Sequence, residues 1–426
     1  MPSRPRTSSV PTPTTREACA ELDAADPLAA FRDEFVLPEG VIYLDGNSLG
    51  ALPKATPGRV ADLVEREWGQ GLIRSWNDAG WWDKPRTLGA ALAPLVGAAP
   101  HEVVVGDGTS ANLFKTLVAA LRLNPGRRVV LGEPGNFPTD LYVTQGVAGL
   151  VDGVEHRLAD PDDPERIAAA LAAGDVAVVL LSHVDYRTGA LRDMAGITAA
   201  AHAHGALAVW DLCHSVGAVP IDLTGCQVDF AVGCTYKYLN GGPGGPAFTY
   251  VAERHHADAR QPITGWHGHA RPFDFTGEYV PAAGASRFLS GSQPLVAAAA
   301  LEASLEMWSR VDLRQVRAKS LVLTDLFRSM AEAAGLAALT PRAAERRGSQ
   351  VALRHPDGYA IVRALIERGV IGDFRAPDVL RFGFAPLYLR HVDVFDAATA
   401  LAEVVESGEW RQPRFAERAT ASGPVT

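Results

Sequence analysis

Lys237 lies in a setting where its amine could act as a nucleophile. It follows the apolar run Asp229-Phe-Ala-Val-Gly-Cys-Thr-Tyr and precedes a glycine-rich turn, Tyr238-Leu-Asn-Gly-Gly-Pro-Gly-Gly-Pro. Such surroundings can strip water from a lysine side chain, which frees its amine to form an imine with a carbonyl group. Arginine cannot do this, because a guanidinium stays protonated. Lysine is also rare here, since only five of the 40 basic residues are lysines: Lys54, Lys84, Lys115, Lys237 and Lys319.

Asp211 could supply a charged partner for this chemistry. It ends the apolar run Leu207-Ala-Val-Trp, and ligands of open parallel sheets bind at the carboxyl ends of the strands. Taken alone, Asp211 is better explained as a helix cap or a turn residue. Together with Lys237 at the end of the next strand, it matches the needs of pyridoxal 5'-phosphate, which are a lysine that holds the cofactor and an anion beside its pyridinium nitrogen.

The segment Gly106-Asp-Gly-Thr-Ser-Ala-Asn112 could hold a phosphate group. It follows a predicted strand and opens a predicted helix, so its backbone N–H groups and the positive end of the helix dipole favour a dianion. Thr109 and Ser110 add hydroxyl donors. The same letters fit the G-x-G-x-x-A dinucleotide motif, but its acidic residue about 20 positions later is missing, because the first one is Glu133. A phosphate site is therefore favoured over a nicotinamide site.

Alternating strands and helices must position these residues. Short runs rich in valine predict strands at 103–105, 128–132, 175–181, 207–210 and 229–232, with helices at 112–122, 163–173 and 193–203. This alternation implies right-handed crossovers and a mainly parallel sheet covered on both faces, which is an α/β architecture. Helical spacing is also found upstream, at 54–70 and 86–97.

The C-terminal part follows a different pattern. One long helix is predicted from Pro294 to about Ala334, followed by strands at 350–354 and 379–384 and helices at 358–368 and 391–405. We therefore expect a small α+β domain after the large one. The expected parts are a disordered tail (1–20), an N-terminal segment that contributes to the small domain and the active site (21–70), a large cofactor-binding domain (71–300), a small C-terminal domain (301–416) and a loose tail (417–426).

The composition argues against nucleic acid, a membrane and a metal ion as partners. A net charge of −9 offers no basic surface for nucleic acid, and no stretch approaches the roughly 20 apolar residues of a membrane span. No apolar segment of a secretory signal follows the basic N-terminus. We expect a cytoplasmic protein without a metal site, because no metal-binding spacing relates the four cysteines, Cys19, Cys213, Cys226 and Cys234.

Ordered segments between about residues 40 and 400 carry a family resemblance. They are Tyr43-Leu-Asp-Gly-Asn-Ser-Leu-Gly50, Asn136-Phe-Pro-Thr-Asp140, Ser182-His-Val-Asp-Tyr-Arg-Thr-Gly189, Asp211-Leu-Cys-His-Ser-Val-Gly217, Thr235-Tyr-Lys-Tyr-Leu-Asn240 and Gly265-Trp-His-Gly268. In this order and spacing they resemble kynureninases, which are pyridoxal-phosphate enzymes of the aspartate aminotransferase fold (fold type I). The resemblance implies that fold, with a mainly parallel sheet in the large domain.

The resemblance also implies a cofactor site. Lys237 would hold pyridoxal 5'-phosphate, Asp211 would pair with its pyridinium nitrogen, and Phe137 would stack on its ring. Trp266 and Ser292 would reach in from the partner subunit of a homodimer. The residues implied around the phosphate are Thr109, Ser110, Tyr236, Trp266 and Ser292, and those implied around the rest of the cofactor are Phe137, Asp140, Ser182, Asp211, His214 and Lys237. Taken separately, Phe137 and Trp266 could be core aromatics.

Substrate contacts follow from the same resemblance. Arg381, in Val379-Leu-Arg-Phe-Gly-Phe-Ala-Pro-Leu-Tyr388, would clamp the α-carboxylate with a bidentate guanidinium, although alone it could be a surface ion pair. Asn47, Trp76 and Gly291 are also expected to contact the substrate. Gly291-Ser-Gln-Pro294 replaces the Gly-Thr-Pro-Pro or Ser-Asn-Pro-Pro of the family, which leaves the ring-substituent preference open. Trp76, Gly291 and Ser292 nevertheless resemble bacterial members that favour kynurenine.

The activity implied is hydrolysis of the Cβ–Cγ bond of L-kynurenine, or of 3-hydroxy-L-kynurenine, to anthranilate or 3-hydroxyanthranilate and L-alanine. Tyr236 would assist proton movement, and the reaction would serve tryptophan catabolism and NAD biosynthesis. A cysteine desulfurase would need a nucleophilic cysteine in the C-terminal half, but none follows Cys234. The chemistry of Lys237 and Asp211 would also suit an aminotransferase, and only the kynureninase-like motifs argue against that activity. A binding protein without catalysis would not need Lys237, Asp211 and Arg381 together.

Overall fold

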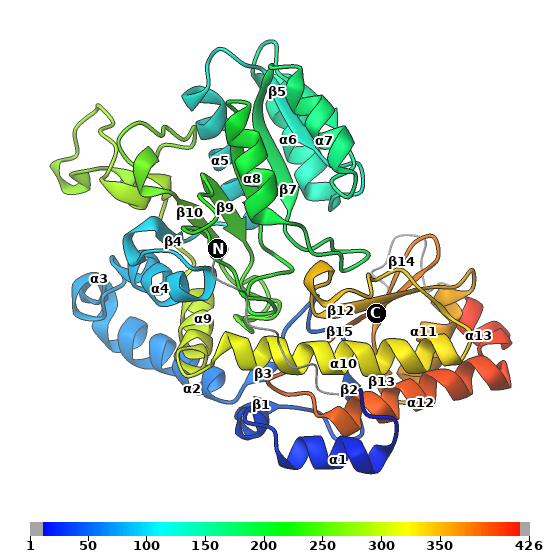
Figure 1. Cartoon of the computed structure of the whole chain (residues 1–426). Coiled ribbons are helices and arrows are strands. Elements are labelled where there is room, and N and C mark those ends of the chain that lie inside the picture. The colour runs from blue at the N-terminus through cyan, green and yellow to red at the C-terminus, as the bar shows by residue number, and fades with distance from the viewer. Residues whose placement is uncertain (1–11, 418–426) are drawn as a thin grey trace.

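The computed structural model describes residues 12–417, which form an α/β structure with a seven-stranded and a four-stranded sheet (Figure 1). Residues 1–11 and 418–426, which belong to the two predicted tails, lie outside the described residues. The predicted N-terminal disorder is wrong for residues 16–20. These residues begin helix α1 (Arg16–Ala24), because the Thr15 hydroxyl accepts a hydrogen bond from Ala18 N and caps the first turn.

The seven-stranded sheet contains all the strands predicted for the large domain, within one residue at each end. Its order is β4 (Val103–Val105), β10 (Phe248–Val251), β9 (Phe230–Gly233), β8 (Leu207–Asp211), β7 (Val176–Ser182), β5 (Val129–Gly132) and β6 (Glu155–Leu158). β10 runs antiparallel to the other six strands, which are parallel to one another. The sequence analysis missed β10 and β6. The polar letters of β6, Glu-His-Arg-Leu, reflect its place at the sheet edge.

Helices cover both faces of this sheet. Leu113 and Leu117 of α5 (Thr109–Leu123), with α6 (Pro138–Leu150), pack on the strand residues of one face. Ile167 of α7 (Pro164–Ala172) and Met194 of α8 (Met194–Ala203) pack on those of the other face. Alternate residues of the strands therefore enter two separate cores. Among residues 12–417, no helix combines the length and the apolar character needed to cross a bilayer.

The predicted long helix from Pro294 to Ala334 is wrong in one respect, because it is two helices. α9 (Leu295–Trp308) ends before Ser309, and α10 (Leu313–Ala333) begins after Asp312, whose side chain accepts from Arg314 N and caps the new helix. α9 packs on α2 (Ala55–Asp62) and α4 (Lys84–Leu92), whereas α10 packs on α12 (His391–Ser407). The predicted domain boundary at residue 301 falls within α9.

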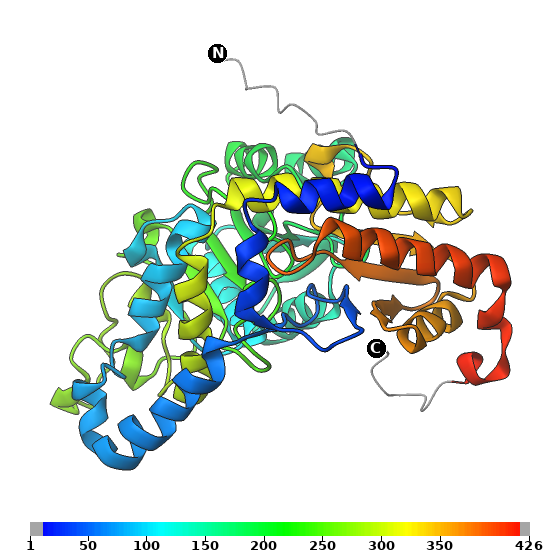
Figure 2. The same ribbon diagram turned by 90° about the horizontal axis from the view of Figure 1, so that it is seen from below.

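The C-terminal part combines a small antiparallel sheet with helices. The sheet order is β11 (Ala337–Ala338), β12 (Gln350–Arg354), β15 (Val379–Gly383) and β14 (Asp373–Arg375). α1 packs on α12 beside α10 (Figure 2). Further elements are β1 (Phe35–Val36), β3 (Leu52–Pro53), a π-helix at Leu63–Gly71, α3 (Ser75–Asp78), α11 (Gly358–Glu367), α13 (Pro413–Ala416) and several short 3-10 helices.

The N-terminal segment lies directly on the end of β15. β2 (Ile42–Tyr43) pairs in parallel with β13 (Val370–Ile371), and Asp45 forms a bridge with Gly383. Residue 383 must be glycine, since a Cβ there would lie 2.0 Å from Asn47 Oδ1. This close approach places residues 45–48 beside Arg381.

Asp229 stabilises the opposite, amino end of the large sheet. Its buried carboxylate accepts hydrogen bonds from His202 Nε2 and His255 Nε2, both at 2.7 Å, and from Arg254 Nη2 and Ala208 N. Burial disfavours the charge, but the hydrogen bonds from His202 and His255 outweigh it and hold the pKa of Asp229 well below its usual range. A carboxylate with a lowered pKa adds stability at neutral pH that is lost as the pH falls from about 5.

We expect Asp229→Asn to lower the free energy of unfolding at pH 7 by about 3 kcal/mol, because the partners of a buried charge remain. Urea unfolding of both proteins checks this. The difference between them should shrink as the pH falls from about 5 to about 3, where the carboxylate of the unfolded chain takes up its proton. A difference that stays constant over that range would contradict the electrostatic explanation.

Candidate active site

A cavity of about 370 Å³ opens at the carboxyl ends of the strands of the large sheet. Its size suits a small cofactor with part of a substrate. The predicted residues that line it are Thr109, Ser110, Phe137, Asp140, Ser182, Asp211, His214, Tyr236 and Lys237. They come from segments spread over more than a quarter of the chain, and the parallel strands bring them together because each ends at the same edge.

The amine of Lys237 borders this cavity and forms no ion pair with a carboxylate in the described residues. Its Nζ lies 2.8 Å from His214 Nε2 and 5.8 Å from the centre of the Phe137 ring. Burial and the positive charge of Lys237 hold the pKa of His214 well below its usual range, so the imidazole is neutral and can accept a hydrogen bond from the amine. Lys84, Lys115 and Lys319 are buried in ion pairs elsewhere, and Lys54 is exposed.

Two carboxyl groups lie in the same cavity. Asp211 ends β8, and its Oδ1 accepts a hydrogen bond from Cys213 N at 2.6 Å, which fixes the carboxylate. Burial and the charges of Asp211 and Glu133 raise the pKa of Asp140 well above its usual range. Asn136 Nδ2 donates to Asp140 Oδ2 at 3.0 Å, whereas Asp140 Oδ1 is buried without a partner among the described residues. The raised pKa favours the neutral form of Asp140, which adds no charge beside Asp211.

The amino end of α5 is suited to a phosphate. No side chain caps this end, and the first N–H groups of a helix have no partners within the helix. The hydroxyl groups of Thr109 and Ser110 lie at the same place. The neighbouring Asp107 does not repel an anion strongly, because the buried Lys115 amine pairs with its carboxylate. Gln293 Oε1 accepts from Asp107 N at 3.0 Å and steadies the loop.

These features fit pyridoxal 5'-phosphate. The cavity offers an amine, an anion, an aromatic face and an anion-binding helix end, as the cofactor requires. It also contains two buried polar atoms without a partner in residues 12–417, Asp140 Oδ1 and His214 Nδ1. Buried polar atoms are normally hydrogen-bonded, so these two favour a polar ligand in the cavity.

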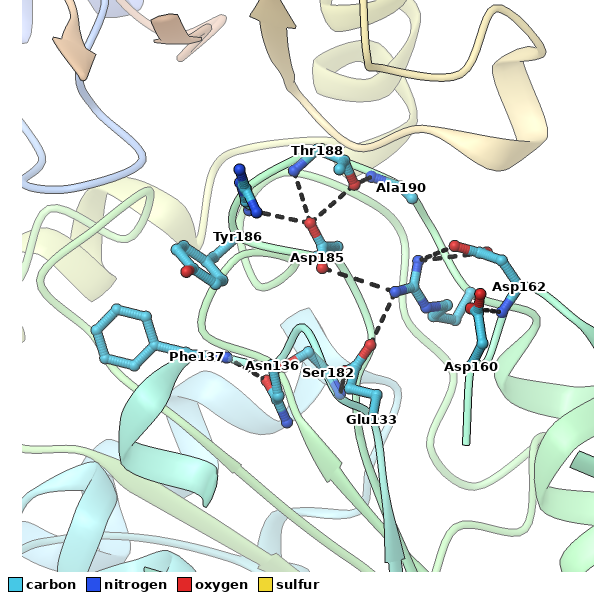
Figure 3. A network of polar contacts seen from close by, with 12 residues as sticks. Glu133, Asn136, Phe137, Asp160, Asp162, Ser182, Asp185, Tyr186, Thr188 and Ala190 are labelled. Carbon is cyan, nitrogen blue, oxygen red and sulfur yellow. Dashed lines mark hydrogen bonds and ion pairs between the residues drawn. The ribbon is translucent and has the colours of Figure 1, made fainter. Parts of the chain in front are cut away.

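A buried network holds the loops that carry the aromatic side chains (Figure 3). Arg192 Nη2 pairs with Glu133 Oε2 at 2.8 Å, and Glu133 Oε1 accepts from Ser182 N at 2.9 Å. Asn136 Oδ1 accepts from Ser182 Oγ at 2.6 Å and from Phe137 N at 2.7 Å. The Phe137 ring, 40% exposed, is therefore anchored through its own backbone to the ends of β5 and β7.

Six predicted residues do not line the cavity of the single chain, and they are Trp76, Trp266, Gly291, Ser292, Arg381 and Asn47. Trp76 and Trp266 meet in an aromatic cluster with ring centres 6.2 Å apart, and Trp266 is 37% exposed. Gly291 and Ser292 are exposed. The sequence analysis expected Trp266 and Ser292 to act from a partner subunit, and this stays a prediction.

Arg381 and Asn47 lie behind the cavity wall. Arg381 is 1% exposed, and its Nη1 donates to the carbonyl oxygen of Tyr186, which lines the cavity, at 2.7 Å. Asn47 is fully buried beside it, with an amide atom 3.2 Å from Arg381 Nε. Asp373 already binds the Nε–Nη2 edge of the guanidinium. A bidentate contact with the substrate carboxylate would therefore have to use the Nη1–Nη2 edge.

The sequence analysis missed three residues of this region, Tyr186, Gln293 and Asp373. Tyr186 contacts the Phe137 ring edge-on at 5.2 Å, and its place just after a strand, within a segment already singled out, was a usable signal. Gln293 also lies in a segment already singled out, Gly291-Ser-Gln-Pro294, but Asp373 carried no such signal, because its pairing with Arg381 depends on how distant segments fold together.

The sequence matches known kynureninases. A family model described as the kynureninase C-terminal domain matches residues 316–401. The kynureninase of Burkholderia mallei (strain SAVP1) is 50% identical over 416 residues, which cover 96% of this chain and 100% of that protein. The kynureninase of Pseudomonas fluorescens is 50% identical over 414 residues, covering 95% of this chain and 99% of that protein.

Solved structures share the fold. A cysteine desulfurase from Thermococcus onnurineus NA1 has a TM-score of 0.75 at 18% identity, covering 89% of this chain and 98% of that chain. A variant of the lyase C-DES, with glycine covalently linked to its pyridoxal-phosphate cofactor, has a TM-score of 0.75 at 19% identity, covering 87% and 99%. This likeness confirms the predicted fold class. The kinship at 50% identity extends over nearly the whole length of both sequences, and the chain therefore belongs to the kynureninase family.

Proposed function

We propose that this chain hydrolyses the Cβ–Cγ bond of L-kynurenine to give anthranilate and L-alanine, with pyridoxal 5'-phosphate held by Lys237. The observation that carries the proposal is one cavity that gathers Lys237, Asp211 and the amino end of α5, in a chain 50% identical to kynureninases along its length. Phe137, Ser182, His214 and Asp140 line the same cavity and would hold the cofactor ring, and Thr109 and Ser110 would hold its phosphate.

The bound cofactor supplies an electron sink for negative charge at the substrate carbons next to the amine. Asp211, whose carboxylate is oriented by the hydrogen bond from Cys213 N, would pair with the ring nitrogen of the cofactor, and its negative charge would favour the protonated form of that nitrogen. Lys237, once free, removes the proton from the substrate α-carbon, and the neutral His214 holds that amine in place at 2.8 Å.

Water then adds to the side-chain ketone, and collapse of this adduct would break the Cβ–Cγ bond. The carboxyl group of anthranilate forms on one side, and the electron pair of the broken bond stays on the carbon that takes up a proton to become Cβ of alanine. Tyr236 would assist with a proton. The neighbouring Cys234 and burial raise the pKa of Tyr236 above its usual range, so its phenol keeps a proton to donate. Tyr236 lines the cavity immediately before Lys237, within reach of the same reaction centre.

The proposal includes a site for the substrate carboxylate and a homodimer. Arg381 binds the α-carboxylate, with Asn47 beside it. In a homodimer, Trp266 and Ser292 of one subunit close the phosphate site of the other, and Trp76 and Gly291 contact the substrate ring. The exposure of Trp266 and Ser292 in the single chain supports this assembly. We place the enzyme in the cytoplasm, in tryptophan catabolism that feeds NAD biosynthesis.

A steady-state assay of the purified holoenzyme tests the activity. L-kynurenine and 3-hydroxy-L-kynurenine are compared, with the fluorescence of the anthranilate product and the alanine released as readouts. Equal amounts of anthranilate and alanine from L-kynurenine are the expected result. A keto acid in place of alanine would indicate transamination and would overturn the proposal.

The pH dependence of substrate binding tests the site of Arg381. Burial and the charge of Asp373 raise the pKa of Asp45 to about 7, with Arg381 opposing them. The other charged or titratable groups that influence Asp45 or are influenced by it are Arg375, Tyr43, Tyr238 and Tyr388. A substrate carboxylate at Arg381 raises the pKa of Asp45 further, so binding takes up a proton.

We therefore expect KM for L-kynurenine to rise above pH 7, by up to about tenfold per pH unit. Asp45→Asn removes this titration and should flatten the profile. Measuring KM for both proteins across the pH range checks the expectation. An unchanged slope in Asp45→Asn would rule out Asp45 as its source.

A further inference from the structure

The guanidinium of Arg381 is bound along one whole edge. Nε donates to Asp373 Oδ1 at 2.9 Å and Nη2 donates to Asp373 Oδ2, and the two side chains are 2% and 0% exposed. Nη2 also donates to Ser48 Oγ at 2.7 Å, and Nη1 to Tyr186 O at 2.7 Å. A guanidinium has five N–H groups, so a single Nη1 proton remains without a partner among the described residues.

Backbone register makes this pairing specific. Asp373 in β14 lies directly opposite Arg381 in β15, and directly opposed side chains of antiparallel strands lie in contact. The contact between Gly383 and Asn47 brings the 45–48 segment onto the end of β15, which places the Ser48 hydroxyl at the other edge of the guanidinium. Asp373 in β14, Ser48 in the 45–48 segment and the carbonyl oxygen of Tyr186 thus fix the Arg381 side chain.

Asp373 neutralises the buried positive charge of Arg381. A guanidinium on a side chain that is 2% exposed needs a counter-charge whenever no substrate is bound, because an unpaired buried charge is strongly destabilising. Asp373 supplies that charge from the Nε–Nη2 edge. The Nη1–Nη2 edge meets only two neutral acceptors, the Ser48 hydroxyl and the Tyr186 carbonyl, and Tyr186 lines the cavity. An incoming carboxylate is a better acceptor than either.

We propose that Asp373 is the positioning residue that turns the Nη1–Nη2 edge of Arg381 toward the cavity, so that the pair selects amino acids with a free α-carboxylate. The inference rests on the proposed function, because it takes Arg381 as the carboxylate site. The substrate carboxylate replaces the contacts of Ser48 and Tyr186, while Asp373 keeps its own edge throughout. Asp373 itself does not touch the substrate.

Binding of two small ligands to the holoenzyme tests this without turnover. L-alanine carries the carboxylate, and L-alaninamide lacks its charge. Both are titrated by the change in cofactor absorbance. The wild-type protein should prefer L-alanine, and in Asp373→Asn this preference should fall by about 10-fold to 100-fold, because a displaced guanidinium no longer meets the carboxylate. KM for L-kynurenine should rise by a similar factor, with a smaller change in kcat.

Asp378→Asn is the matched control. Asp378 lies just before β15 and pairs with Arg187 and Arg354, but not with Arg381, so its loss should leave the preference unchanged. Asp373→Glu keeps the charge and lengthens the side chain, so it should lose part of the preference. It serves in place of Asp373→Asn if that variant does not fold.

The outcomes separate the two proposals. An unchanged preference for L-alanine over L-alaninamide in the Asp373 variants overturns the positioning role. An equal loss of affinity for both ligands does so too, because it indicates general damage to the fold. The wild-type protein could fail to cleave L-kynurenine and still prefer L-alanine, with Asp373→Asn abolishing that preference. This result would overturn the proposed activity and leave the role of Asp373 standing.

Discussion

Replacing Lys237 with alanine should lower kcat/KM for L-kynurenine by about 10⁴-fold, because the variant lacks both the covalent attachment of the cofactor and the base at the substrate α-carbon. None of the other lysines can take its place, since three are buried in ion pairs and Lys54 is exposed elsewhere. Anthranilate fluorescence measures the rate. The visible absorbance of lysine-bound cofactor should disappear in the same protein.

Lys84→Ala is the matched control for this experiment. Lys84 is also buried, but its amine pairs with Glu302 at 2.6 Å, away from the cavity. Its loss should affect stability and leave both the absorbance and kcat close to those of the wild type. Retention of more than about a hundredth of the wild-type activity in Lys237→Ala would exceed what substitute bases supply and would assign the base to another group.

Replacing Asp211 with asparagine should lower kcat by about 10²-fold to 10³-fold, because a neutral amide no longer keeps the cofactor nitrogen positive. The amide oxygen can still accept from Cys213 N, so the shape of the site is preserved. Cofactor binding should weaken less than kcat. Measurements of kcat, and of the cofactor concentration that restores half of the activity, separate the two effects.

Asp229→Asn provides the comparison for Asp211→Asn. Both replace a buried aspartate near β8 and β9, but Asp211 lies at the carboxyl end of the sheet and Asp229 at the amino end. Asp229→Asn should lose stability and keep kcat, and Asp211→Asn should do the reverse. If both variants lose kcat in proportion to stability, Asp211 has no electronic role.

The strands and their carboxyl ends could be predicted from the sequence. Valine-rich runs such as 176–181 are short and apolar on both faces, which is typical of strands in a sheet covered on both sides. The alternation of such runs with helices predicts parallel strands, which places Asp211 and Lys237 at the same edge of the sheet. The predicted cofactor residues of a single chain therefore gather in one cavity. Local patterns sufficed for Asp211, which ends β8, and for Lys237, which lies in the turn after β9, because both positions follow from the predicted strands.

Contacts between distant segments could not be predicted in this way. The break between α9 and α10 depends on a cap at Asp312 inside a long helical pattern. The pairing of Asp373 with Arg381 depends on strand register, and the approach of Ser48 depends on the packing of the N-terminal segment. Residues such as Trp266 are expected to contact the site of a second subunit, and a single chain does not make those contacts.

The scarcity and pairing of the lysines have a practical consequence for chemical labelling. Lys84, Lys115 and Lys319 are shielded in ion pairs, whereas Lys54 is exposed and Lys237 borders the cavity. An amine-selective reagent therefore meets only two accessible lysine side chains in the described residues. Peptide mapping after brief acylation would then report the occupancy of the cavity directly, as the ratio of label on Lys237 to label on Lys54, which serves as an internal reference.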